Sequence, residues 1–67
     1  MAEIPIAPIQ RLIKKAGAHR VGEDAAESLR DYLEKQAIDI AKRASELAAH
    51  AGRKTVRESD IVLALKE

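Results

Sequence analysis

The chain has 67 residues and a mass of 7.3 kDa, so it forms at most one domain, spanning residues 1–67. A domain of this size buries too little surface to be stable alone and usually needs disulfides, a metal or a partner chain. The sequence has no cysteine, and its two histidines, His19 and His50, lie 31 positions apart, which excludes disulfides, thiolate metal sites and a local metal-ligand spacing. We therefore expect no metal and no cofactor, and we expect a second chain to supply the missing stability.

The composition favours closely packed helices. Apolar residues make up 46% of the chain, many of them are alanine, and Tyr32 is the only aromatic residue. Such a profile is typical of helices that approach through small side chains, and it argues against a β-sandwich or barrel. The chain has no apolar run of membrane-spanning length and no signal-peptide pattern, so we expect a soluble, cytoplasmic protein with no membrane partner.

The net charge of +1 hides an uneven distribution of charge. Residues 1–22 carry four basic residues and one acid, residues 23–51 carry four basic residues and seven acids, and residues 52–67 carry four basic residues and three acids. Two basic clusters therefore flank an acidic centre. This asymmetry indicates a polyanionic partner, although an ordinary solvated surface would explain it equally well.

The first predicted helix covers residues 7–16. Pro5 and Pro8 bracket its start, since proline is tolerated in the first turn, where backbone N–H groups need no partner. Gly17 suits a left-handed position just after its end. A loop over residues 18–22 follows, in which Val21 is the only large apolar residue and is expected to point inward.

The second predicted helix runs over residues 23–51 without a helix breaker. Its stripe recurs in steps of one, three or four residues: Ala25, Leu29, Tyr32, Leu33, Gln36, Ala37, Ile40, Ala44, Leu47 and Ala48. A helix of this length extends for about 40 Å at 1.5 Å per residue, which is more than two short helices can cover. The middle of the stripe, residues 33–40, therefore needs a second copy of the chain, most economically in an antiparallel pair about a two-fold axis.

Gly52 ends the second helix, and residues 53–56 form the second loop. The third predicted helix covers residues 57–66. Two capping boxes could start it, Thr55 with Glu58 or Arg57 with Asp60, and the threonine box fits the known preference better.

The order of short, long and short helices, with a basic loop at each end of the long one, resembles the histone fold, and specifically an archaeal histone. The residues that carry the resemblance are 4–9 (IPIAPI) with Arg11, 16–18 (AGA) before Arg20 and Val21, and 50–56 (HAGRKTV) before Asp60 and Ile61. They cover nearly the whole chain in order and at the family's spacing. The resemblance implies an all-α histone fold in an intertwined handshake homodimer that binds, bends and wraps duplex DNA.

The resemblance also assigns DNA-binding residues. In a handshake dimer the first loop of one chain lies beside the second loop of the other, which brings Arg20 together with Lys54 and Thr55. Arginine, lysine and a hydroxyl supply the fixed charge and the donors that phosphates need, although Thr55 could instead only cap the third helix. Arg11 matches the family's minor-groove arginine, and Lys14 and Lys15 are expected to meet phosphates, or else to be solvated.

Two further sets of residues take structural roles by resemblance. Arg53 and Asp60 match an ion pair that joins the second loop to the third helix. The positions through which family dimers join into four-helix bundles are Leu47, His50, Asp60 and Leu63. The alternative for His50 is a solvated position near a helix end. The resemblance thus implies tetramers or longer stacked assemblies on DNA, and it allows a heterodimer with a paralogous histone.

The function expected from these features is chromosome compaction in nucleosome-like assemblies, by a protein associated with the chromosome in the nucleoid. The main alternative keeps the fold but makes the chain a protein–protein scaffold within a transcription complex. That alternative predicts that basic residues are lost from the two loops, whereas Arg20, Lys54 and Thr55 are all present. An enzyme is not expected, because the sequence has no Ser–His–acid spacing and no complete phosphate-binding loop.

Overall fold

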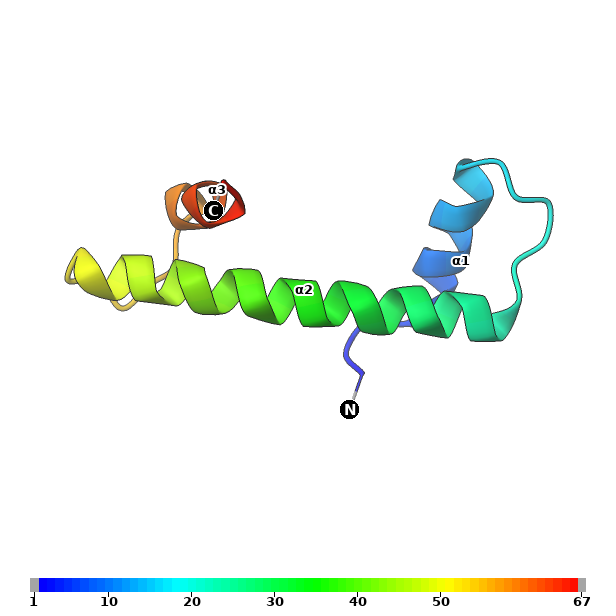
Figure 1. Cartoon of the computed structure of the whole chain (residues 1–67), viewed down its shortest axis with the longest axis horizontal. Coiled ribbons are helices and arrows are strands. Elements are labelled where there is room, and N and C mark those ends of the chain that lie inside the picture. Colours follow the sequence, from blue (N-terminus) through cyan, green and yellow to red (C-terminus); the bar gives the residue numbers. More distant parts are fainter. Residues whose placement is uncertain (1, 67) are drawn as a thin grey trace. The chain divides into compact units, whose positions relative to one another are not determined.

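The computed structural model describes residues 2–66, which form three α-helices and no strand. Helix α1 spans Ile6–Lys15, α2 spans Glu23–His50 and α3 spans Glu58–Leu65 (Figure 1). Each helix begins and ends within one residue of the bounds expected from the sequence. The predicted all-α class, with the order short, long and short, is confirmed.

Two compact units divide the chain, residues 1–35 and residues 36–67, and α2 runs through both. The first unit contains α1 and the N-terminal part of α2. The second contains the rest of α2, the second loop and α3. The boundary falls inside the stretch 33–40, where the sequence predicts that α2 needs a second copy.

Both helix ends before the two loops rely on a glycine with a positive φ angle. Gly52 follows α2 with a φ of +75°, and its N–H donates to the carbonyl of Ala49 at 2.9 Å, while the N–H of Arg53 donates to the carbonyl of Ala48, also at 2.9 Å. These two bonds define a Schellman motif, which satisfies the last carbonyls of the helix and turns the chain sharply. Gly17, at +119°, closes α1 in the same way.

We predict that Gly52→Ala destabilises the protein by about 1–2 kcal/mol, because a residue with a Cβ atom pays that amount in the left-handed region. No atom lies within 4 Å of the added Cβ, so the cost arises from the backbone conformation and not from a clash. Urea denaturation at fixed protein concentration measures it. Ala51→Gly is the comparison variant. If it loses as much stability as Gly52→Ala, the positive φ angle at position 52 is not the cause of the loss.

The buried core is small and consists mainly of alanine. The first unit buries Ile9 and Ala26, and the second buries Ala44, Ala48, Asp60 and Ala64. Large apolar side chains remain exposed along the chain: Leu12, Leu29, Tyr32, Leu33, Ile38, Val56, Val62, Leu63 and Leu65. An exposed set of this size is the mark of an association surface, in agreement with the expected partner chain.

The predicted stripe on α2 needs one correction. Ala25 is exposed and Ala26 is completely buried, because in the first unit α2 turns the face of Ala26, Arg30 and Glu34 inward. Ala26 and Leu33 are seven residues apart and therefore lie within about 20° of each other around the helix. Ala26 thus belongs to the same stripe, in which the large side chains of Leu29, Tyr32 and Leu33 stay exposed. In the second unit the buried face contains Ala44 and Ala48, as predicted. The stripe is therefore fully buried only at Ala26, Ala44 and Ala48, and its large side chains in the first unit stay open.

Candidate nucleic-acid interface

Three of the predicted DNA-binding residues lie on α1. Arg11, Lys14 and Lys15 are all exposed, and the two lysines occupy the last turn of the helix. Cations are favoured there, because the carbonyl groups at a helix C-terminus carry partial negative charge. The C-terminus of α1 therefore stabilises the positive charges of Lys14 and Lys15, and both side chains are exposed to solvent.

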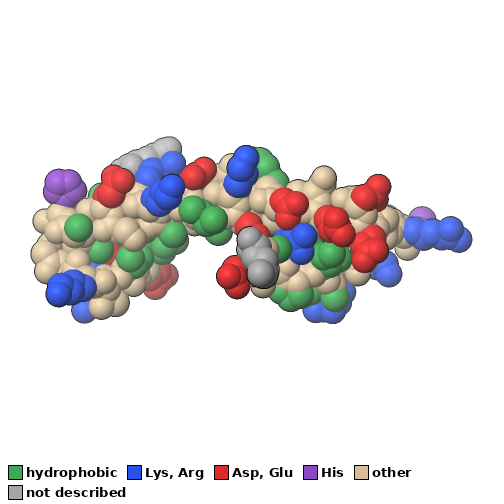
Figure 2. Space-filling view, turned by 90° about the horizontal axis from the view of Figure 1, so that it is seen from below, with side chains coloured by type: hydrophobic (Ala, Val, Ile, Leu, Met, Phe, Trp, Pro, Cys, Tyr) green, Lys and Arg blue, Asp and Glu red, His purple; other side chains and the backbone are tan. Residues whose placement is uncertain are grey.

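The other predicted phosphate contact of the first unit lies in the loop after α1. Arg20 is exposed, its neighbour His19 is exposed, and Val21 is half-buried, which agrees with the expected inward position of Val21. Figure 2 shows acidic side chains gathered over the unit that contains α1, with lysine and arginine side chains projecting at its end. The acids of α2 in this unit are Glu23, Asp24, Glu27, Asp31 and Glu34. A polyanion would therefore meet α1 and the loop and avoid the acidic side of α2.

In the second unit, Lys54 and Thr55 are both exposed in the loop before α3. The shape of this loop is set by Arg53. Its Nη1 atom donates to the backbone carbonyl of Thr55 at 3.0 Å and to Oδ2 of Asp60 at 2.9 Å, and its Nη2 atom donates to Oδ1 of Asp60 at 2.8 Å. One guanidinium group thus bridges the loop and α3, and it holds Lys54 and Thr55 on the outside.

Asp60 is the only charged or polar residue buried in residues 2–66, at 5% exposure. Besides the two bonds from Arg53, its Oδ2 atom accepts the backbone N–H of Arg57 at 2.8 Å. The hydrogen bond from the Arg53 side chain, followed by that from the Arg57 backbone, lowers the pKa of Asp60 from 3.8 to about 2, although burial acts in the opposite direction. The same pair raises the pKa of Arg53 above its ordinary value.

These contacts predict a specific loss of stability in acid. Because the pKa of Asp60 is depressed in the folded protein, its contribution is complete above the ordinary value of 3.8 and disappears as the pH falls through about 2. We expect the difference in urea midpoint between wild type and Asp60→Asn to be constant above about pH 5 and to narrow below pH 4. Asp31→Asn is the control, because its carboxylate is 66% exposed. A difference that stays constant down to pH 2 would contradict the assignment.

The start of α3 corrects the predicted capping box. The helix begins at Glu58 with Arg57 at the N-cap, and Asp60, three residues later, accepts the N–H of Arg57. The preferred alternative, Thr55 with Glu58, is wrong, because Arg53 orients Asp60 from outside the helix and makes it the better acceptor. Thr55 does not cap α3, and no hydrogen bond within residues 2–66 engages its hydroxyl.

Four of the six arginines separate into two groups by their contacts. Arg53 and Arg30 are partly buried and bind within the protein: Arg53 pairs with Asp60, and Arg30 pairs with Asp31 at 2.8 Å and donates to the carbonyl of Ile4 at 3.3 Å. Among residues 2–66, no hydrogen bond or ion pair engages the side chains of Arg11 and Arg20, or those of Lys14, Lys15 and Lys54. The fold therefore uses some arginines internally and leaves the predicted DNA-binding ones open.

The four predicted dimer–dimer residues all belong to the second unit. Leu47 is half-buried, His50 is exposed, Asp60 is buried, and Leu63 is 48% exposed. A shallow depression is lined by Glu46, Ala49 and His50, and another includes Glu58, Val62 and Leu63. Of the four residues, Leu63 and His50 are the ones that present open surface.

Sequence reasoning missed one contact in the first unit. The carboxylate of Glu34 accepts the backbone N–H groups of Glu3 at 2.5 Å and Ile4 at 2.6 Å. Pro5 indicated an extended segment whose N–H groups need acceptors, but nothing in the sequence shows which of the acids on α2 supplies one.

The chain matches known proteins over nearly its full length. Residues 2–65 match the family described as histone-like transcription factor (CBF/NF-Y) and archaeal histone. The chain is 64% identical over 66 residues to one subunit of the archaeal histone HAN1 of Thermococcus zilligii, with 98% of each chain covered. It is 48% identical over 66 residues to probable archaeal histone 3 of Methanocaldococcus jannaschii, again with 98% of each chain covered.

The chain therefore belongs to the family of histone-like transcription factors and archaeal histones. This confirms the resemblance that the sequence suggested and places the protein among DNA-binding proteins with the histone fold. In the part of the chain that the structure describes, no helix is both long and apolar enough to cross a membrane, and no three His, Asp or Glu residues cluster as metal ligands.

Proposed function

We propose that the protein is an architectural DNA-binding protein, not an enzyme, that bends and wraps duplex DNA as a handshake homodimer. It acts in the cytoplasm on the chromosome and compacts it in nucleosome-like assemblies. The observation that carries the proposal is the contrast between arginines: Arg30 and Arg53 bind within the chain, while Arg11 and Arg20 stay exposed without a partner among residues 2–66.

The exposed apolar surface supports dimerisation. Leu29 (36%), Tyr32 (58%) and Leu33 (37%) lie uncovered on α2, next to the boundary between the two units. Burying such side chains stabilises by about 1.5–3 kcal/mol each, which a core of alanines and one isoleucine cannot supply. A second copy that crosses α2 in this stretch covers them. A paralogous histone could take the same position, and the description of the Thermococcus relative as one subunit of a histone supports testing for such a partner.

In such a dimer, Arg20 of one chain lies beside Lys54 and Thr55 of the other. Together they offer a guanidinium fork, an ammonium group and a hydroxyl to one stretch of DNA backbone. The two copies of α1 form a second contact, where Arg11 enters the minor groove and Lys14 and Lys15 bind phosphates. Arginine suits a narrow minor groove, because the negative potential is concentrated there.

The same residues imply weak sequence selectivity. The proposed contacts reach phosphates and the minor groove, and phosphate contacts position a protein without carrying sequence information. Binding should therefore be driven by counterion release and depend steeply on salt concentration.

The test is the affinity for duplexes of unrelated sequence across a salt series. We expect similar affinities for all duplexes and a linear fall of log affinity with log salt, with a slope of about −0.9 for each phosphate contacted. A flat salt dependence, or strong preference for one sequence, would overturn backbone-driven binding. Absence of DNA binding in a protein that forms a clean dimer would favour a scaffold role within a transcription complex.

We further propose that dimers join into longer assemblies. Leu47, His50, Asp60 and Leu63 of one dimer meet the same residues of another in a four-helix bundle, so that dimers join into tetramers or stacks on DNA. The exposure of His50 and Leu63 supports this role. Asp60 would contribute mainly by holding α3 in place through Arg53.

A further inference from the structure

The segment before α1 is tied to α2 by three hydrogen bonds. Glu34 accepts the N–H groups of Glu3 and Ile4, and Nη1 of Arg30 donates to the carbonyl of Ile4 at 3.3 Å. Both α2 residues are partly buried, and Arg30 is held further by Asp31. Bonds to a charged acceptor are about twice as strong as bonds between neutral groups, so Glu34 is the main anchor.

Helix α1 has little else to fix it on its own chain. It has 10 residues, Ile9 is its only buried residue, and its N-cap Pro5 provides no side-chain cap. Isolated helices shorter than about 12–15 residues are marginal in water, so its position depends on tertiary contacts. Of the other large apolar residues of α1, Leu12 is 54% exposed, and Ile6 and Ile13 are half-buried.

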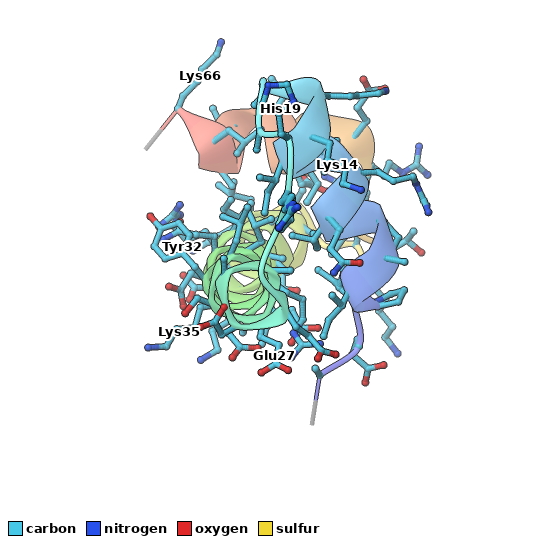
Figure 3. All side chains as sticks on the ribbon, turned by 90° about the vertical axis from the view of Figure 1, so that its right-hand side faces the viewer. Lys14, His19, Glu27, Tyr32, Lys35 and Lys66 are labelled. Atoms are coloured by element: carbon cyan, nitrogen blue, oxygen red, sulfur yellow. The ribbon has the colours of Figure 1, made fainter. Side chains whose placement is uncertain are left out.

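The link between the anchor and the helix is short and stiff. Only Pro5 separates Ile4 from the first residue of α1, and Pro5 adopts a φ of −69° and a ψ of 158°. Because proline cannot vary φ, fixing Ile4 also fixes the direction in which α1 begins. Figure 3 shows α1 with Lys14 on one side of α2, and Tyr32 and Lys35 on the opposite side.

We propose that Glu34, supported by Arg30, is a positioning residue for DNA binding: it anchors residues 3–4 and thereby holds the basic side chains of α1 against the DNA. This inference rests on the proposed function and extends it to an acidic residue that itself repels DNA. A hydrogen bond to DNA requires a donor–acceptor distance of about 2.7–3.2 Å, so a small displacement of α1 removes Arg11, Lys14 and Lys15 from their partners together.

Two variants that remove the same charge separate this role from simple electrostatics. Glu34→Ala deletes the anchor, while Glu27→Ala deletes an exposed acid on α2 that makes no hydrogen bond within residues 2–66 (Figure 3). Loss of a negative charge alone should leave DNA binding unchanged or stronger. We expect Glu27→Ala to behave in this way, and Glu34→Ala to bind about tenfold more weakly, with a salt slope reduced by about 0.9 for each lost contact.

A second pair of variants approaches the same bonds from the other side and leaves α2 intact. Glu3→Pro removes one of the two N–H donors, and Glu3→Ala removes the same exposed side chain but keeps that donor. We expect Glu3→Pro to reduce the salt slope and Glu3→Ala to keep it. Helix content by circular dichroism and dimer mass verify that all four variants fold.

The outcomes distinguish the two proposals. If wild type binds DNA and each variant matches its control in affinity and slope, the positioning role is wrong and the proposed function stands. If wild type does not bind duplex DNA even at low salt, the proposed function is wrong, and the positioning role is wrong with it.

Discussion

Replacing Arg20 with alanine is expected to weaken binding to every DNA sequence by a similar factor. The side chain is exposed in the loop after α1 and has no partner among residues 2–66, so its removal leaves the fold intact. A dimer loses two phosphate contacts, which reduces the salt slope by about 1.8 and the affinity at least about tenfold at moderate salt. Fluorescence anisotropy with several unrelated duplexes measures both quantities.

Lys42→Ala is the matched control for Arg20→Ala. It removes one positive charge from an exposed position on α2, outside residues 29–40, where the second copy is expected to pack. If the two variants bind alike, Arg20 is an ordinary solvated residue. If Arg20→Ala loses affinity only for particular sequences, Arg20 reads bases and the backbone assignment is wrong.

Replacing Asp60 with alanine is expected to cause the largest loss of stability of any single substitution considered. The change removes the acceptor for both hydrogen bonds from Arg53 and for the backbone N–H of Arg57, which is the N-cap of α3. Removing one partner of a buried pair costs more than the pair contributes, because the remaining charge is left without compensation. The urea midpoint of the dimer at fixed concentration measures the loss.

Asp31→Ala provides the comparison for Asp60→Ala. Asp31 also pairs with an arginine at 2.8 Å, but its side chain is 66% exposed, whereas that of Asp60 is 6% exposed. Exposed pairs contribute about 0–1 kcal/mol, so Asp31→Ala should shift the midpoint only slightly. Equal shifts for the two variants would show that the Arg53–Asp60 pair does not hold the second loop on α3.

The sequence was most informative where one residue type determines the local backbone. Gly17 and Gly52 correctly marked the ends of the first two helices. Glycine adopts the positive φ angle found after each helix at little cost, whereas residues with a Cβ atom do not. The order of three helices followed from the same signals and from the periodicity of α2. The resemblance in residues 50–56 then indicated the family, which the comparisons confirmed.

The sequence was least informative where partners lie far apart in the chain. The start of α3 was predicted at the wrong capping box, because Arg53 selects Asp60 as the acceptor across seven positions. The anchor at Glu34 joins residues that are 30 and 31 positions apart. Ala25 was predicted in place of Ala26, since steps of one, three or four residues allow either of two adjacent alanines to belong to the stripe. The roles of the DNA-binding and dimer–dimer residues remain predictions.

The most direct test of the central claim is nuclease digestion of long duplex DNA saturated with the protein. Serial wrapping by histone-fold dimers predicts a ladder of protected fragments that increase in regular steps, each step measuring one assembly unit. Protection at a single length would retain wrapping and exclude stacked assemblies. No protection, from a protein that is a folded dimer in solution, would contradict the account and identify the chain as a histone-fold scaffold for other proteins.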